Sequence, residues 1–223
     1  MKNIDEIIKS RHSVRRYKDN PIEEKLVKRL NEVITKCNQE SGLNIQLILN
    51  DGETFDRYKL HYGQIHNCKN YIALVGKKEK NLDEKAGYYG QRIVLEAQLL
   101  GLNTCWVAGG YKRGCVNAKI NSDEKLVCVI ALGYGTYQGK KPNGKSYKDV
   151  TSEINAPKWF KKGVEYALLA PTAMNQQKFK ISLLNDNIVA IKPGIGPMVK
   201  IDLGIVKYHF ELGAGIDNFQ WQK

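Results

Sequence analysis

The sequence predicts an α+β protein in which helices flank a mostly antiparallel sheet. Two kinds of periodicity support this prediction. Apolar residues recur at helical spacing over residues 26–34 and 88–100, and they alternate with polar residues over residues 45–49 and 179–183. The segments do not follow a strict strand–helix–strand order, which favours an α+β fold over a regular parallel sheet.

Two helices are predicted before the first strand. Residues 4–9 form a short amphipathic pattern, and Pro21 suits the first turn of a second helix. The apolar positions of this second helix are Leu26, Val27, Leu30, Val33 and Ile34. Residues 45–49 then alternate as in a strand, which the turn-forming residues 50–52 end.

The middle of the chain contains the most apolar segments. Residues 71–75 and 126–132 are almost wholly apolar, which predicts two buried strands. Between them, residues 88–100 have the wide apolar face of a helix, and Gly101 is a natural stop. Residues 103–110 follow as a strand or loop that ends in glycines.

The last third repeats part of this order. A helix is predicted over residues 159–169, a strand over 179–183, a turn at 185–186 and a further helix over 202–213. The helix–loop–strand order resembles that of residues 26–51. We interpret this as a partial internal duplication. The alternative is that two unrelated segments share a common order of helices and strands.

The charge of the chain favours anionic partners. Its 223 residues carry 35 Lys plus Arg against 23 Asp plus Glu, a net charge of +12. Phosphorylated cofactors, acidic substrates and nucleic acid would all suit this balance. The basic residues are scattered in doublets rather than gathered in one tract, so we expect no nucleic-acid partner.

The cysteines and the apolar runs indicate the compartment. Five cysteines, an odd number without a C-x-x-C pair, predict neither a disulfide framework nor a metal site. No apolar run reaches the roughly 20 residues of a membrane helix, and the N-terminus does not have the pattern of a signal peptide. We therefore expect a soluble, cytoplasmic protein without a membrane partner.

Residues 11–15 concentrate polar chemistry. In an extended chain Arg11, Ser13 and Arg15 point to one side, which would place two guanidinium groups around one hydroxyl and suit a phosphate. A solvated linker between two helices is the alternative, and composition alone favours it.

Residues 170–177 form the second polar segment. Three amides and a hydroxyl follow a helix there, and amides suit the edge of a heteroaromatic ring because they donate and accept hydrogen bonds. A plain helix-terminating turn would use the same residue types, so this segment alone stays ambiguous.

Together, these segments resemble the FMN-dependent nitroreductase family, in particular its subgroup of short single-chain members with an internally duplicated half. The matching residues of the first motif are Arg11, Ser13, Arg15, Tyr17 and Pro21. The other matches are residues 101–107, 131–134, 170–177, 202–205 and 209–211. The resemblance spans nearly the whole chain and implies a nitroreductase-like fold over residues 1–223, with a main flavin-binding half (1–150) and a partial repeat that covers the flavin (151–223).

The resemblance also implies the residues that bind FMN. Those at the phosphate and the pyrimidine side are Arg11, His12, Ser13 and Arg15. Those that line the ring through backbone groups are Trp106, Val107, Ala108 and Gly109. Those that cover the cofactor are Pro171, Thr172, Ala173 and Asn175. Lys141 and Lys145 are further candidates for the phosphate.

The sequence departs from the common family pattern in one respect. Ordinary members place the covering loop about one helix after the first motif and supply it from the partner subunit. Here residues 37–41 occupy that position and lack the proline, whereas the intact loop lies in the last third. We hypothesise that the repeat replaces part of the partner, giving one FMN site per chain in a monomer (a pseudo-dimer) or a homodimer.

The implied activity is NAD(P)H-dependent reduction of a small organic acceptor through FMN by ping-pong kinetics, with no catalytic protein acid or base. One alternative is a flavin-binding protein without turnover. The other is a P-loop nucleotide-binding protein, because residues 139–146 (GKKPNGKS) fit the G-x-x-x-x-G-K-S string. The apolar strand ends several residues before this string and no good helix pattern follows it, which favours a surface loop.

Overall fold

The computed structural model describes residues 4–55, 64–140, 143–184 and 187–222. The chain forms two compact units. The first consists of Met1–Leu82 and Arg92–Lys141, and the second of Asp83–Gln91 and Pro142–Lys223. One long helix, α3 (Leu82–Leu99), therefore contributes its first half to the second unit and its second half to the first unit.

A four-stranded antiparallel sheet forms the centre of the first unit. Its strands are β1 (Gln46–Ile48), β2 (Asn70–Lys77), β3 (Asn103–Val107) and β4 (Glu124–Gly133), in the order β1-β2-β4-β3. The two central strands are buried along nearly their whole length. Their continuous apolar sequence follows from this position, because both faces of the sheet are covered.

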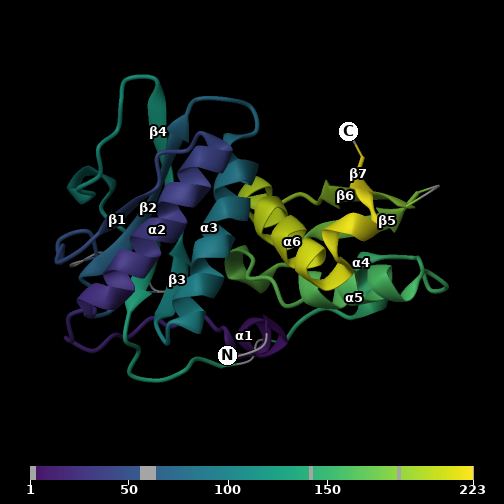
Figure 1. The fold of residues 1–223 in the computed structure, drawn as a ribbon, viewed down its shortest axis with the longest axis horizontal. Helices are drawn as coiled ribbons and strands as arrows, with labels where there is room; N and C mark the ends of the chain where they lie inside the picture. The colour runs from purple at the N-terminus through teal and green to yellow at the C-terminus, as the bar shows by residue number, and fades with distance from the viewer. Residues whose placement is uncertain (1–3, 56–63, 141–142, 185–186, 223) are drawn as a thin grey trace. The chain divides into compact units, whose positions relative to one another are not determined.

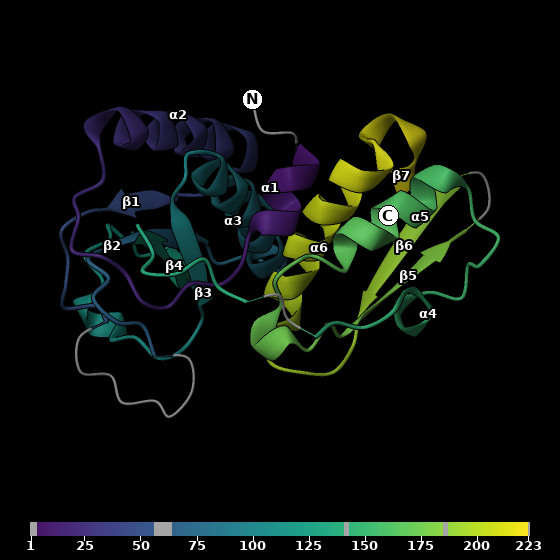
Figure 2. The same ribbon diagram turned by 90° about the horizontal axis from the view of Figure 1, so that it is seen from below.

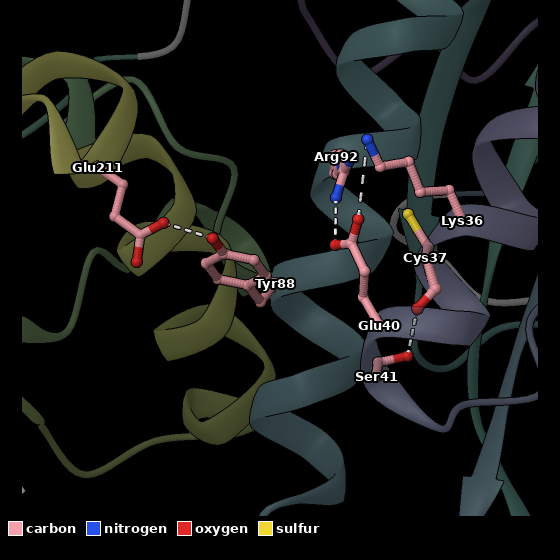
Figure 3. Close-up of polar contacts among 7 residues, drawn as sticks. All are labelled: Lys36, Cys37, Glu40, Ser41, Tyr88, Arg92 and Glu211. Atoms are coloured by element: carbon pink, nitrogen blue, oxygen red, sulfur yellow. Dashed lines mark hydrogen bonds and ion pairs between the residues drawn. The ribbon is translucent and has the colours of Figure 1, made fainter.

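Helix α2 (Glu24–Ser41) and the second half of α3 lie side by side on one face of this sheet (Figures 1 and 2). Arg92 Nη1 donates to Glu40 Oε2 at 2.6 Å, as Figure 3 shows, and Arg29 Nε donates to Glu96 Oε1 at 2.7 Å. Such exposed pairs contribute roughly 0.2–1 kcal/mol each. The apolar faces of the helices therefore supply most of the packing energy.

The first unit also has a large apolar cluster that includes the side chains of alternate strand residues. These residues and the loop residues packed with them are Tyr17, Phe55, Ile65, Cys68, Tyr71, Ala73, Val75, Cys105, Val107, Tyr111, Leu126, Val129 and Ala131. Helix α1 (Ile4–Ser10) precedes the extended segment that contains Tyr17.

The second unit packs helices against a three-stranded sheet of order β5-β6-β7. Its strands are β5 (Phe179–Leu183), β6 (Ile188–Pro193) and β7 (Gln220–Trp221), and its helices besides α3 are α4 (Tyr147–Val150), α5 (Lys158–Ala167) and α6 (Val199–Ala214). Helices α5 and α6 lie side by side (Figure 2). Aromatic rings fill the space around α5, α6 and β7, namely Trp159, Phe160, Phe210, Phe219 and Trp221.

Within the second unit, the first half of α3 packs closely on α6. A Cβ atom at Gly204 would lie only 1.9 Å from the carbonyl oxygen of Glu84, so the two backbones meet where this side chain is missing. Tyr88 donates a hydrogen bond to Glu211 (Figure 3), and buried His209 shares one with Gln91 at 2.8 Å. These contacts hold α6 against the first half of α3.

The structure confirms the α+β class and the predicted helices and strands, with shifted boundaries. Helix α2 begins at Glu24, so Pro21 precedes it rather than lying in its first turn. Helix α3 begins at Leu82 rather than at residue 88, and α6 at Val199 rather than at 202. Strands β6 and β7 and the single turn α4 were not predicted, and the turn at 185–186 lies outside the described residues.

Both units contain the element order helix, two antiparallel strands, helix: α2, β1, β2 and α3 in the first, and α5, β5, β6 and α6 in the second. The third strand differs, since β4 pairs antiparallel with β2 but β7 pairs parallel with β6. Among the described residues no helix has the length and apolar character needed to cross a membrane.

Candidate functional site

The segment of residues 11–15 runs alongside strand β3. Ser13 forms a parallel bridge with Thr104, and the Val14 N–H donates to the Thr104 carbonyl at 3.0 Å. The buried side chain of Val14 anchors the segment in the unit. The fold thereby brings the first predicted group of site residues next to the strand that carries the second group, residues 106–109.

Arg11 is a buried cation in this segment. Its side chain is 7% exposed, and its Nε atom has no acceptor in the part of the chain that the structure describes. Burial lowers the pKa of Arg11 to about 10, against a small opposing effect of Cys105. A buried guanidinium nitrogen without an acceptor is costly, so Arg11 has the character of a residue that would bind an anion or a carbonyl group.

Three residues of the segment affect the titration of Cys105 in β3. Burial raises the pKa of this thiol, while the charges of Arg15 and Arg11 and a hydrogen bond with Ser13 act in the opposite direction. Arg11, Ser13 and Arg15 thus all influence the same buried thiol of β3. The raised pKa keeps Cys105 a neutral thiol, which fits a packing residue rather than a nucleophile.

The end of β3 offers its backbone rather than its side chains. Val107 is buried in the apolar cluster, Trp106 and Ala108 are half-buried, and Gly109 is exposed. Apart from Gly109 and its two chain neighbours, no described residue has an atom within 4 Å of the place where a Cβ atom of Gly109 would be. A flat ring could therefore approach the main chain here, as the family resemblance implies.

The third predicted group lies in the second unit, in the loop of residues 171–177. The loop begins after α5 and contains the short helical turn Ala173–Asn175. Thr172 Oγ1 accepts a hydrogen bond from the Gln177 N–H at 3.0 Å, and Asn175 Nδ2 donates to the Asn143 carbonyl at 2.6 Å. Pro171, Thr172, Ala173 and Asn175 are all half-buried, so each keeps some exposed surface.

Lys145 contacts this loop. Its ammonium group donates to the Gln177 carbonyl at 2.7 Å, and its backbone N–H donates to Gln177 Oε1 at 2.6 Å. To reach a phosphate, the ammonium would have to leave this carbonyl. The other predicted lysine, Lys141, lies outside the described residues.

The P-loop alternative finds no support in the geometry. Strand β4 ends at Gly133, and the helix that follows Ser146 is the four-residue α4. Ser146 caps this helix, with its hydroxyl donating to Asp149 at 2.7 Å. A P-loop needs a strand that leads directly into a longer helix whose N-terminus faces the phosphates.

Residues 37–41 form no loop, in agreement with the missing proline. They are the last turn of α2, where Ser41 Oγ donates to the Cys37 carbonyl at 2.6 Å (Figure 3). The side chain of Asn38 exchanges two hydrogen bonds with the backbone of Ile45. This turn is thus part of the packed scaffold, and the covering-loop motif occurs in the second unit.

Sequence reasoning missed Asp202 and Gln176 as residues of the site. Both help to hold the 171–177 loop. A charged residue in the apolar sequence of α6 was the available signal, since a buried carboxylate normally has a specific partner. Within the described ranges, no cluster of three or more His, Cys, Asp and Glu residues could hold a metal ion.

Comparison with known proteins shows the family. The model of the family described as "Putative TM nitroreductase" matches residues 3–214. A structure from Thermotoga maritima described as a putative nitroreductase is similar over 95% of this chain and 83% of its own, at 22% identity and a TM-score of 0.70. No curated protein matches the chain.

Other similar structures cover less of the chain. An FMN-dependent nitroreductase from Clostridium difficile covers 65% of this chain and 95% of its own, at 22% identity and a TM-score of 0.52. A protein from Clostridium acetobutylicum described as a putative NADH oxidase covers 66% and 98%, at 23% identity and a TM-score of 0.51.

The chain has the nitroreductase-like fold and belongs to the nitroreductase family named above. This membership makes it a nitroreductase-like oxidoreductase.

Proposed function

We propose that the protein is an FMN-dependent oxidoreductase that takes hydride from NADH or NADPH and reduces a small organic acceptor by ping-pong kinetics. The observation that carries this proposal is the buried guanidinium of Arg11, whose Nε lacks a partner among the described residues beside strand β3. A cofactor with a phosphate and a carbonyl-rich ring edge would supply the missing acceptor.

The donors available in the first unit fit FMN. Arg11, Ser13 and Arg15 would hold its phosphate or its pyrimidine edge, and His12 flanks them. The main chain of residues 106–109 would lie against the ring. In the second unit we assign Pro171, Thr172, Ala173 and Asn175 to the cofactor from the motif, while Lys145 orders their loop and Lys141 stays a candidate for the phosphate.

FMN, when bound, supplies the hydride chemistry. The protein binds and orients the cofactor, and its cations stabilise the negative charge that develops at the pyrimidine edge on reduction. No side chain needs to act as a catalytic acid or base. The nicotinamide donor is supported by the similar structure from Clostridium acetobutylicum, which is described as a putative NADH oxidase.

The test begins with an absorbance scan of freshly purified protein and mass identification of any released chromophore. We expect a yellow protein that releases FMN. Initial rates with varied NADPH and a quinone or nitroaromatic acceptor should then give the parallel double-reciprocal lines of a ping-pong mechanism. Bound FMN that dithionite reduces but nicotinamides do not would instead indicate a flavin carrier or sensor. Protein that takes up no FMN would overturn the proposal.

A further inference from the structure

A buried carboxylate forms hydrogen bonds with the 171–177 loop. Asp202 lies in the first turn of α6 and is 7% exposed. Its Oδ1 accepts from the Ala173 N–H at 2.9 Å, and its Oδ2 accepts from Gln176 Nε2 at 2.8 Å. The same Gln176 amide donates to the Pro197 carbonyl at 2.7 Å, so both of its donors are used.

The loop needs this support because its backbone is strained. Met174, Asn175 and Gln177 all have left-handed backbone angles, with φ values of 52°, 52° and 44°. Non-glycine residues adopt such angles at a cost, and the conformation persists only where surrounding contacts impose it. Asp202 and Gln176 fix both ends of the short turn Ala173–Asn175, which contains two of the three strained residues.

Among the residues that the structure describes, no positive side chain balances the charge of Asp202. Neither the loop of residues 171–177 nor residues 194–198 contain an ionisable side chain. The flanking Lys178 and Lys200 are exposed, and Glu84 of α3 pairs with Lys207. Burial raises the pKa of Asp202 to about 6, while the bonds from Gln176 and Ala173 act in the opposite direction.

The ionised carboxylate therefore costs the fold stability at neutral pH, because desolvation outweighs its hydrogen bonds. An uncharged residue of the same shape would avoid this cost. A costly charge that serves a strained loop is typical of a functional requirement, since function and stability are often in conflict at such sites.

We propose that Asp202 is a positioning residue for the flavin site: through Ala173 and Gln176 its carboxylate holds the 171–177 loop in the conformation that binds FMN. The inference rests on the proposed function. The inference assigns a role to Asp202, which lies outside the predicted cofactor-binding residues. It also explains why a charged side chain is buried at this position.

The substitution Asp202→Asn separates positioning from general stability. Asparagine keeps an oxygen for the Ala173 N–H but turns its NH₂ group toward the NH₂ group of Gln176. Gln176 must then rotate and give up its bond to Pro197, and the loop changes. We expect FMN to bind about tenfold more weakly, which corresponds to the loss of about one hydrogen bond. We expect the urea midpoint of the FMN-free variant at neutral pH to equal or exceed that of the wild type.

Two further variants complete the experiment. Gln176→Leu leaves the carboxylate charged with one partner fewer, so we expect weaker FMN binding together with lower stability. Asp217→Asn makes the same charge change at an exposed position after α6 and should alter neither property. The visible circular dichroism of FMN-saturated protein should change in Asp202→Asn and stay unchanged in Asp217→Asn.

The outcomes distinguish the two proposals. Wild-type protein that binds no FMN would refute the proposed function itself. If the wild type binds FMN and Asp202→Asn binds it equally well with an unchanged dichroism spectrum, only the positioning role is refuted. Parallel losses of affinity and stability in Asp202→Asn would also refute it, because they indicate a purely structural residue.

Discussion

Arg11 and Asp202 are buried ions, one in each unit, and neither forms an ion pair within the described residues. Sequence motifs predicted Arg11 as a cofactor ligand, but its burial comes from the packing of its segment on β3. Asp202 could not be predicted as a support of the 171–177 loop, because it contacts Ala173 across 29 positions of the chain. Patterns within a segment indicate which groups are available, whereas partners distant in sequence become visible only in the fold.

The role of Arg11 leads to a prediction about cofactor binding. Replacing it with methionine removes the charge but fills a similar volume. We expect FMN to bind more weakly by about 1.5–3 kcal/mol, or roughly 10- to 150-fold, as for the loss of a charge-assisted hydrogen bond. The FMN-free protein should be no less stable, since a buried unpaired cation is removed.

Flavin fluorescence quenching and urea unfolding measure these two effects. Arg16→Met, a change at the neighbouring exposed arginine, is the matched control and should bind FMN normally. An Arg11→Met variant with wild-type FMN affinity would place the phosphate site elsewhere.

The raised pKa of Asp202 predicts how stability depends on pH. The folded protein holds this proton up to about pH 6, whereas the unfolded chain releases it near its ordinary pKa of about 4. The stability that protonated Asp202 contributes to the fold is therefore fully present below about pH 4. It is lost as the pH rises through 6, and the total loss is about 3 kcal/mol at most. The stability advantage of Asp202→Asn over the wild type should grow between pH 4 and 6 and then level off. Urea unfolding across this range measures it, and a constant difference would contradict the assignment.

At the level of elements, the sequence predicted those helices and strands whose apolar residues follow a regular local pattern. The buried strands β2 and β4 and the helices α2, α3, α5 and α6 all have a clear pattern of their own. Strand β7 has two residues and exists only because it pairs with β6, so no local pattern could predict it. The extra turns at the start of α3 and α6 likewise depend on the packing between these helices within the second unit.

This packing makes Gly204 a sensitive position. The Cβ atom of alanine would lie 1.9 Å from the Glu84 carbonyl oxygen and 2.6 Å from the Tyr88 nitrogen, both of which are backbone atoms that cannot rotate away. We expect Gly204→Ala to destabilise the protein by about 3 kcal/mol or more, as for severe overpacking. Gly114→Ala meets open space and should change stability by less than about 0.5 kcal/mol. Thermal unfolding of both variants tests this, and equal midpoints would contradict the close packing of α3 on α6.

At the level of the whole molecule, the sequence predicted the fold class and the family. It did not predict that α3 would divide between two compact units, because the helix has no break in its pattern at Gln91. The first cofactor motif lies in one unit and the covering loop in the other. From the family resemblance alone, we propose that one chain supplies both motifs to its FMN, with one FMN per chain.

A mixing experiment tests this hypothesis. Chains with Arg11→Met and chains with Asn175→Ala are co-expressed, and FMN bound per chain is measured in the purified mixture. A site formed within one chain cannot be restored by mixing, so the FMN content should stay as low as in the separate variants. Recovery of FMN in a dimeric fraction would show that the loop is supplied by a partner subunit, as in ordinary members of the family.

The central claim is that this nitroreductase-like chain transfers hydride from a nicotinamide through FMN. The most direct test is to add NADH or NADPH to the purified, FMN-loaded protein without oxygen and to follow the flavin absorbance band. We predict that one of the two nicotinamides bleaches the band within a single turnover and that an added quinone or nitroaromatic restores it. A band that neither nicotinamide bleaches, in protein whose FMN dithionite reduces, would contradict the claim.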